Sequence, residues 1–67
     1  MQPGEIFQEL RKRREMLGIT QPHLAELSGL GVRTVKALEN GSGNPTYQTI
    51  SRIAEVLGMQ ITLQIKK

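Results

Sequence analysis

Apolar residues along the first 58 positions recur every three to four residues, which is the spacing of an amphipathic helix. Ile6, Leu10 and Leu17 fall on one stripe and predict a first helix at about 4–17. Gly18 follows this stripe, and glycine is a typical residue for ending a helix. No linker, internal repeat or low-complexity segment interrupts the pattern, so we expect the helices to form one unit.

Residues 20–41 predict two short helices joined by a tight turn. Thr20 is a good N-cap for the first of these helices. Gly29 supplies the turn, because glycine adopts backbone conformations that strain other residues. The second helix is predicted at 31–39 or 32–40. The apolar positions expected to hold the pair together are Leu24, Leu27, Leu30, Val35 and Leu38.

A polar loop at 41–45 leads to a last predicted helix at about 47–57. Thr46 is placed to cap the beginning of this helix, and Gly58 is placed to end it. The inward positions would be Ile50, Ile53, Ala54 and Leu57. The first 58 residues therefore predict an all-α, compact domain of four to five helices.

The hydrophobic period changes in the tail. Apolar and polar residues alternate over 59–65, with Met59, Ile61, Leu63 and Ile65 against Gln60, Thr62 and Gln64. A period of two predicts a strand with one buried face, and a frayed tail or an extra helical turn is the alternative. A strand needs a partner for its backbone groups, and no other segment predicts one. We therefore expect it to pair with the same strand of a second copy, with Ile61, Leu63 and Ile65 facing the helices.

The second helix of the predicted pair has a polar, basic outer face. At about 100° per residue, Val35 and Leu38 mark its buried side. The opposite side carries Arg33, Lys36, Ala37 and Asn40, with Val32 at its flank. A guanidinium, an ammonium, a methyl and a carboxamide suit a groove lined with base edges and phosphates. The arrangement indicates a helix-turn-helix reader of the DNA major groove, and an ordinary solvated helix face is the alternative.

Several positions of this helix pair resemble a known family. Thr20-Gln21, Ala25, Gly29 and the closing Leu38-Glu39-Asn40-Gly41 are similar to the lambda-repressor/Cro-type, or XRE-type, DNA-binding domains. The resemblance covers about residues 6–58 and implies a lambda-repressor-like helix-turn-helix fold. The chain departs from the phage repressors at Val32 and Ala37, where polar residues are common in that family.

The resemblance and the outer face together give the candidate DNA contacts. Base reading is predicted for Val32, Arg33, Lys36 and Ala37. Contacts to the DNA backbone are predicted for Gln21, Thr34, Asn40, Ser42, Asn44 and Thr46. Because Val32 and Ala37 cannot donate hydrogen bonds, direct readout should depend on the two cations and on contacts with thymine methyl groups.

An ion pair is predicted between Arg14 and Glu39. Arg14 lies on the core-side edge of the first helix, four residues after Leu10, and Glu39 follows Leu38. Members of the resembled family often carry Arg and Glu at these two places, paired and partly buried. The pair would fix the second helix of the motif against the first helix of the domain.

The tail adds a narrower resemblance. A helix-turn-helix domain followed by Leu57-Gly58-Met59-Gln60-Ile61-Thr62-Leu63 is similar to the HipB-type antitoxins. This implies a dimeric repressor closed by a small intermolecular sheet, with a HipA-type Ser/Thr kinase toxin as a second partner. We therefore predict a DNA-binding domain at 1–58 and a dimerisation strand with a basic tail at 59–67. The strand residues would be Met59, Ile61, Thr62, Leu63 and Ile65.

Length and charge add modest support. The chain has 67 residues, which allows one domain with a small core, and its net charge is +3 with a pI near 9.8. Lys66 and Lys67 carry two of these charges, so residues 1–65 carry only +1. Arg11-Lys12-Arg13-Arg14 form one basic run, of which Arg11 to Arg13 either contact phosphate or are solvated. Without cysteine, signal peptide or an apolar run of about 18 residues, we expect a cytoplasmic, nucleoid-associated bacterial protein without membrane contact.

The residues offer little for catalysis. Aspartate is absent, the six glutamates are scattered, and His23 is the sole histidine. No metal-ligand spacing or phosphate-cradling loop follows from these residues, so neither an enzyme nor a cofactor is expected. The predicted function is a homodimeric, sequence-specific repressor that binds a pseudo-palindromic operator in double-stranded DNA. The alternatives are a protein-interaction module that neutralises a partner, and a regulator lacking its ligand-sensing domain.

Overall fold

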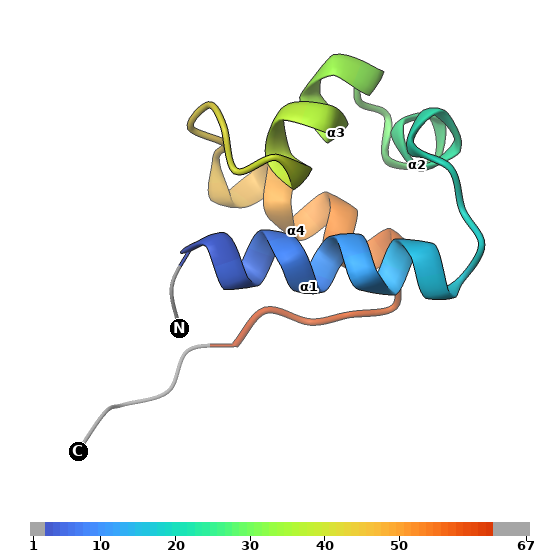
Figure 1. The fold of residues 1–67 in the computed structure, drawn as a ribbon, viewed down its shortest axis with the longest axis horizontal. Helices are drawn as coiled ribbons and strands as arrows, with labels where there is room; N and C mark the ends of the chain where they lie inside the picture. The colour runs from blue at the N-terminus through green and yellow to red at the C-terminus, as the bar shows by residue number, and fades with distance from the viewer. Residues whose placement is uncertain (1–2, 63–67) are drawn as a thin grey trace.

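The computed structural model describes residues 3–62, which contain four helices (Figure 1). They are α1 at Pro3–Met16, α2 at Gln21–Ser28, α3 at Val32–Glu39 and α4 at Tyr47–Val56. Each of these ranges agrees with the pattern of apolar residues to within one position at the predicted ends. The all-α prediction is therefore confirmed for the described residues.

Both predicted threonine caps are present. Thr20 and Thr46 have extended backbone conformations, and each side chain accepts a hydrogen bond from the backbone N–H three residues further on. The Oγ1–N distances are 3.2 Å to His23 and 3.1 Å to Thr49. These bonds satisfy N–H groups that the first turn of a helix otherwise leaves without a partner. The two caps fix where α2 and α4 begin.

The core is formed by all four helices. α2 packs against both α3 and α4, and α1 packs against α3. The buried apolar side chains are Leu10, Leu24, Ala25, Val35, Leu38, Ile53, Ala54 and Leu57. Leu17 and Leu27 were also expected on buried stripes, but they are 45% and 51% exposed. Leu17 lies beyond the end of α1, and Leu27 lies at the margin of the contact between α2 and α4.

The tail departs from the predicted strand. Residues 59–62 form no strand, and Leu63 and Ile65 lie outside the described residues. The alternation of sides is nevertheless present, since Met59 and Ile61 pack against the core whereas Gln60 and Thr62 are exposed. The segment runs back along α1 (Figure 1). The predicted strand depends on pairing with a second copy, and the described residues of one chain supply no neighbouring strand for its backbone groups, so it does not form here.

Gly29 and Gly31 give opposite predictions for the same substitution. Gly29 has a left-handed backbone with φ of 71°. Gly31 is an N-cap with φ of −77° and no capping side chain, and a Cβ added there would meet open space. Gly29→Ser should lower the free energy of unfolding by about 1–2 kcal/mol. Gly31→Ser should raise it by a few tenths of a kcal/mol, because serine can cap α3. Urea unfolding followed by circular dichroism measures both; equal effects would contradict the prediction.

Candidate nucleic-acid interface

The outer face of α3 is where the structure places the predicted base-reading residues. Val35 and Leu38 are 0% and 1% exposed and hold the helix to the core. Val32, Arg33, Thr34 and Lys36 are exposed on the other side. We call Val32, Arg33, Lys36 and Ala37 the reading face. In Figure 1, α2 is seen almost along its axis while α3 crosses the view, so the two helices are steeply inclined.

Arg33 and Lys36 are free to meet a ligand. No carboxylate of the described residues lies within ion-pair distance of either side chain. Two exposed cations of α1 lie near carboxylates instead, Arg11 near Glu15 and Lys12 near Glu9. Two unpaired cations one helical turn apart give α3 a positive surface that can approach base edges or phosphates.

The loop after α3 brings several predicted backbone-contact residues together. A shallow hollow of about 190 Å³ between α3 and this loop has Thr34, Ala37, Ser42 and Asn44 in its lining. The Ser42 backbone N–H and hydroxyl both donate to the Ala37 carbonyl, at 2.9 and 3.2 Å. These bonds hold the loop against α3. Ala37 is consequently half-buried, so it presents less surface to a groove than the other three reading-face residues.

Thr46 is already committed to its helix. Its Oγ1 accepts from the Thr49 backbone N–H and donates to the Thr49 Oγ1, at 3.1 and 3.0 Å. A hydrogen bond from the Thr46 hydroxyl to a phosphate would therefore have to replace its bond to Thr49 Oγ1. Asn40 and Asn44 are exposed, and the described residues offer neither amide side chain a hydrogen bond.

Arg14 and Glu39 lie side by side beneath α3. Arg14 Nε donates to Glu39 Oε2 at 2.6 Å, and Arg14 Nη2 donates to Glu39 Oε1 at 3.0 Å. The two side chains are 11% and 2% exposed. The hydrogen bonds to Glu39 raise the pKa of the Arg14 guanidinium above its ordinary value, while burial opposes the shift. Arg14 Nη1 also donates to the Ile19 carbonyl at 2.8 Å, which ties the α1–α2 connection to the pair.

Gln21 joins this cluster, which the sequence had not indicated. Its Nε2 donates to Glu39 Oε1 at 2.9 Å. The resemblance had suggested Gln21 as a phosphate contact and Glu39 as a partner of Arg14, but it gave no link between them. Such a link depends on how the beginning of α2 meets the end of α3, and no local pattern carries that information.

Arg13 was also placed differently from the expectation for the basic run. Its Nε donates to the Leu57 carbonyl at 2.9 Å, so it fastens the end of α4 to α1. The hydrogen bond satisfies one of the carbonyls that the last turn of a helix leaves without an internal partner. Arg13 and Arg14 thus have structural contacts within the described residues.

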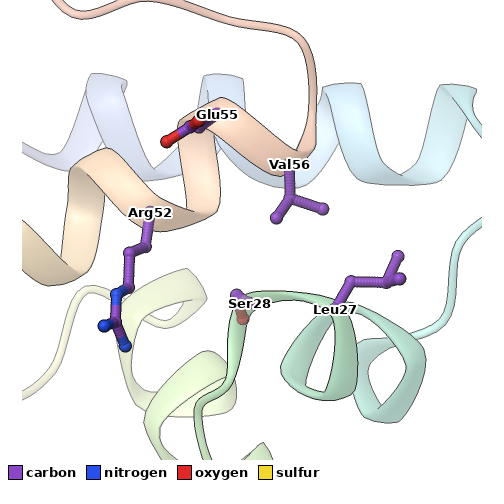
Figure 2. A pocket seen from close by; sticks show the side chains of 5 residues that line it. All are labelled: Leu27, Ser28, Arg52, Glu55 and Val56. Atoms are coloured by element: carbon purple, nitrogen blue, oxygen red, sulfur yellow. The ribbon is translucent and has the colours of Figure 1, made fainter.

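A larger hollow lies apart from the reading face. It measures about 400 Å³ and is lined by Leu27 and Ser28 of α2 with Arg52, Glu55 and Val56 of α4 (Figure 2). The Ser28 hydroxyl donates to the Leu24 carbonyl at 2.7 Å, so it is not offered to a ligand. The lining contains none of the predicted DNA contacts. Elsewhere, too, residues 3–62 gather no cluster of three metal-binding side chains, and none of their helices could span a bilayer.

The Arg14–Glu39 pair gives a prediction for stability. Arg14→Met or Glu39→Met alone should lower the free energy of unfolding by about 3–5 kcal/mol, because each leaves a buried charge without its partner. The double variant should lose much less, since neither charge remains. The exposed Arg11–Glu15 pair, 3.9 Å apart, is the matched control and should show a coupling of only about 0.3–0.5 kcal/mol. Urea unfolding of both cycles tests this; equal couplings would contradict it.

Comparison with known proteins agrees with this geometry. The helix-turn-helix family (HTH_3) matches residues 10–64. A protein of Methanothermobacter thermautotrophicus named "Uncharacterized HTH-type transcriptional regulator" is 41% identical over 51 residues, covering 76% of this chain and 74% of that protein. A protein of Haemophilus influenzae with the same name is 31% identical over 58 residues, covering 87% and 59%. The chain therefore belongs to the XRE-type helix-turn-helix family.

Proposed function

We propose that the chain is a sequence-specific, DNA-binding transcriptional regulator that acts as a homodimeric repressor. The reading face of α3 is the observation that carries this proposal. It presents Arg33 and Lys36, neither of them paired with a carboxylate of residues 3–62, on a helix whose opposite side is fixed in the core. Membership of the family and the names of the two relatives, both HTH-type transcriptional regulators, support it.

In this proposal α3 lies in the major groove, which is about 12 Å wide and admits a helix. Arg33 would donate two hydrogen bonds to a guanine edge, the commonest specific contact of arginine. Lys36 would read an adjacent base or contact a phosphate. The methyl groups of Val32 and Ala37 would meet thymine methyls, because neither side chain can donate a hydrogen bond.

The surroundings of α3 would contact the DNA backbone and set its register. Gln21 is the first residue of α2, Thr34 lies in the first turn of α3, and Asn40 follows the last residue of α3. The loop residues Ser42 and Asn44 line the hollow beside α3 described above, and Thr46 follows this loop as the N-cap of α4. Contacts of this kind position a protein on DNA without reading sequence.

The tail would form the interface of the proposed dimer. Met59 and Ile61 border an apolar hollow of about 360 Å³ whose other walls include Ile6, Leu10 and Ala54. In the proposed dimer residues 59–65 pair with the same residues of a second copy, so that Leu63 and Ile65 extend the apolar side begun by Ile61. A twofold axis at this strand would separate the two copies of α3 by about 34–36 Å, one turn of DNA, or by a multiple of it.

The resemblance of the tail to HipB-type antitoxins extends the proposal to a HipA-type Ser/Thr kinase toxin as a second partner. The alternative function is that of a protein-interaction module whose main role is to bind and neutralise such a partner. The two functions predict different behaviour on DNA, since only a repressor should select one duplex sequence. A gene for a kinase-like protein beside this one would support the antitoxin role.

Selection from random duplexes tests sequence-specific binding, and Arg33→Ala tests its origin. The variant should lose about 1–3 kcal/mol of binding free energy and relax the preference at one position of each half-site. Arg52→Ala, which removes an exposed arginine from α4, is the matched control and should keep the full preference. Equal affinity of the unaltered chain for every duplex at physiological salt would overturn the proposed function.

Truncation tests the proposed dimer strand. A chain ending at Gly58 should sediment as a weaker dimer and bind the operator poorly, although its reading face is intact. A chain ending at Ile65 is the control, because it lacks the charges of Lys66 and Lys67 but keeps the apolar tail. Sedimentation and operator titration at several salt concentrations compare the three chains. Dimerisation and operator binding of the shortest chain like those of the full chain would exclude this role.

A further inference from the structure

The Glu39 carboxylate joins two parts of the candidate interface. Glu39 is the last residue of α3 and Gln21 is the first residue of α2. The carboxylate accepts two hydrogen bonds from Arg14 and a third from Gln21 Nε2. Because the Glu39 side chain is only 2% exposed, this third bond is sheltered from competing water. It therefore holds the Gln21 side chain in one orientation relative to α3.

Gln21 retains hydrogen-bonding capacity beyond this contact. A primary amide carries two N–H donors, and the bond to Glu39 uses one of them. The second hydrogen has no partner among the described residues, and Gln21 is only half-buried. The side chain thus bridges from a buried anion to the surface with one donor still available.

We propose that Glu39 and Arg14 are positioning residues for a DNA-backbone contact made by Gln21. The second Nε2 hydrogen of Gln21 donates to a phosphate oxygen while the first remains on Glu39. This inference rests on the proposed function, since it assumes that α3 occupies the major groove. Its consequence is that a buried pair without any DNA contact of its own contributes to operator affinity.

Two physical effects make this arrangement favourable. A free glutamine side chain loses rotamer freedom when it binds, whereas one already held by Glu39 loses little. A carboxylate near a phosphate would normally repel it, but the two bonds from the Arg14 guanidinium offset its charge. Arg14 therefore permits an anion to orient a phosphate donor.

A cycle of variants measures the coupling between Gln21 and the Arg14–Glu39 pair in operator binding. Gln21→Ala in the unaltered chain should weaken operator binding about tenfold, the loss expected for one hydrogen bond to a charged group. The Arg14→Met/Glu39→Met chain should lose a similar amount while remaining folded. Adding Gln21→Ala to that chain should then change the affinity by less than about twofold, because the amide is no longer held. A merely structural pair would leave the loss from Gln21→Ala equal in both backgrounds.

Salt dependence and a matched control identify the contact. Gln21→Ala should weaken all duplexes alike and leave the slope of log affinity against log salt unchanged, because a neutral donor releases no counterion. Gln8→Ala removes an exposed glutamine from α1 that makes no hydrogen bond in the described structure, and it should leave affinity unaltered. A preference change at one base position for Gln21→Ala would overturn the phosphate assignment.

The unaltered chain provides a test that does not depend on how the variants fold. The side-chain amide of Gln21 gives two proton resonances in an NMR spectrum. On addition of the selected duplex, one resonance should shift and the other should keep its free-state position. If neither moves while the duplex is bound, the positioning role is overturned but the proposed function stands. If no duplex is bound specifically, the proposed function fails and this inference fails with it.

Discussion

The buried carboxylate of Glu39 is the constraint on which the rest of this interface depends. An ionised group can leave water only where other groups replace its hydrogen bonds and balance its charge. Arg14 of α1 supplies two of those bonds, and Gln21 of α2 supplies one. Glu39 thereby places the end of α3 with respect to two other helices. Apolar packing alone would fix the depth of α3 but would resist sliding and rotation less strictly.

This firm hold on α3 matters because the helix is short. An isolated helix of eight residues is unstable in water, so its conformation depends on the surface beneath it. Val35 and Leu38 supply that surface contact, and the hydrogen bonds from Ser42 to the Ala37 carbonyl hold the following loop in place. Of the reading-face side chains, Val32, Arg33 and Lys36 are exposed and only Ala37 is half-buried, so the core does not depend on the first three. In the proposed function, substitutions at Val32, Arg33 and Lys36 would change the sequence preference at positions that the fold does not use.

The sequence predicted what is local and missed what depends on tertiary contacts. The helix spans follow from apolar period and capping, so Thr20, Gly29 and Thr46 were placed correctly. The exposed side of α3 follows from the same geometry. The bond from Gln21 to Glu39, the bond from Arg13 to the Leu57 carbonyl and the exposure of Leu27 arise where separate helices meet. A pattern along one helix cannot indicate which residue of another helix it will face.

The tail shows how a correct side-chain pattern can mislead about the backbone. Met59 and Ile61 face the core as a strand residue should, yet no strand forms at 59–62. Burial of alternate side chains needs only an extended segment beside α1, whereas a strand also needs a second segment to receive its backbone hydrogen bonds. In one chain the Met59 N–H donates to the Ala54 carbonyl at 2.8 Å, so the backbone groups left for water lie at 60–62. A second copy could replace that water while its apolar residues cover more of the small core, so association and strand formation would be a single event.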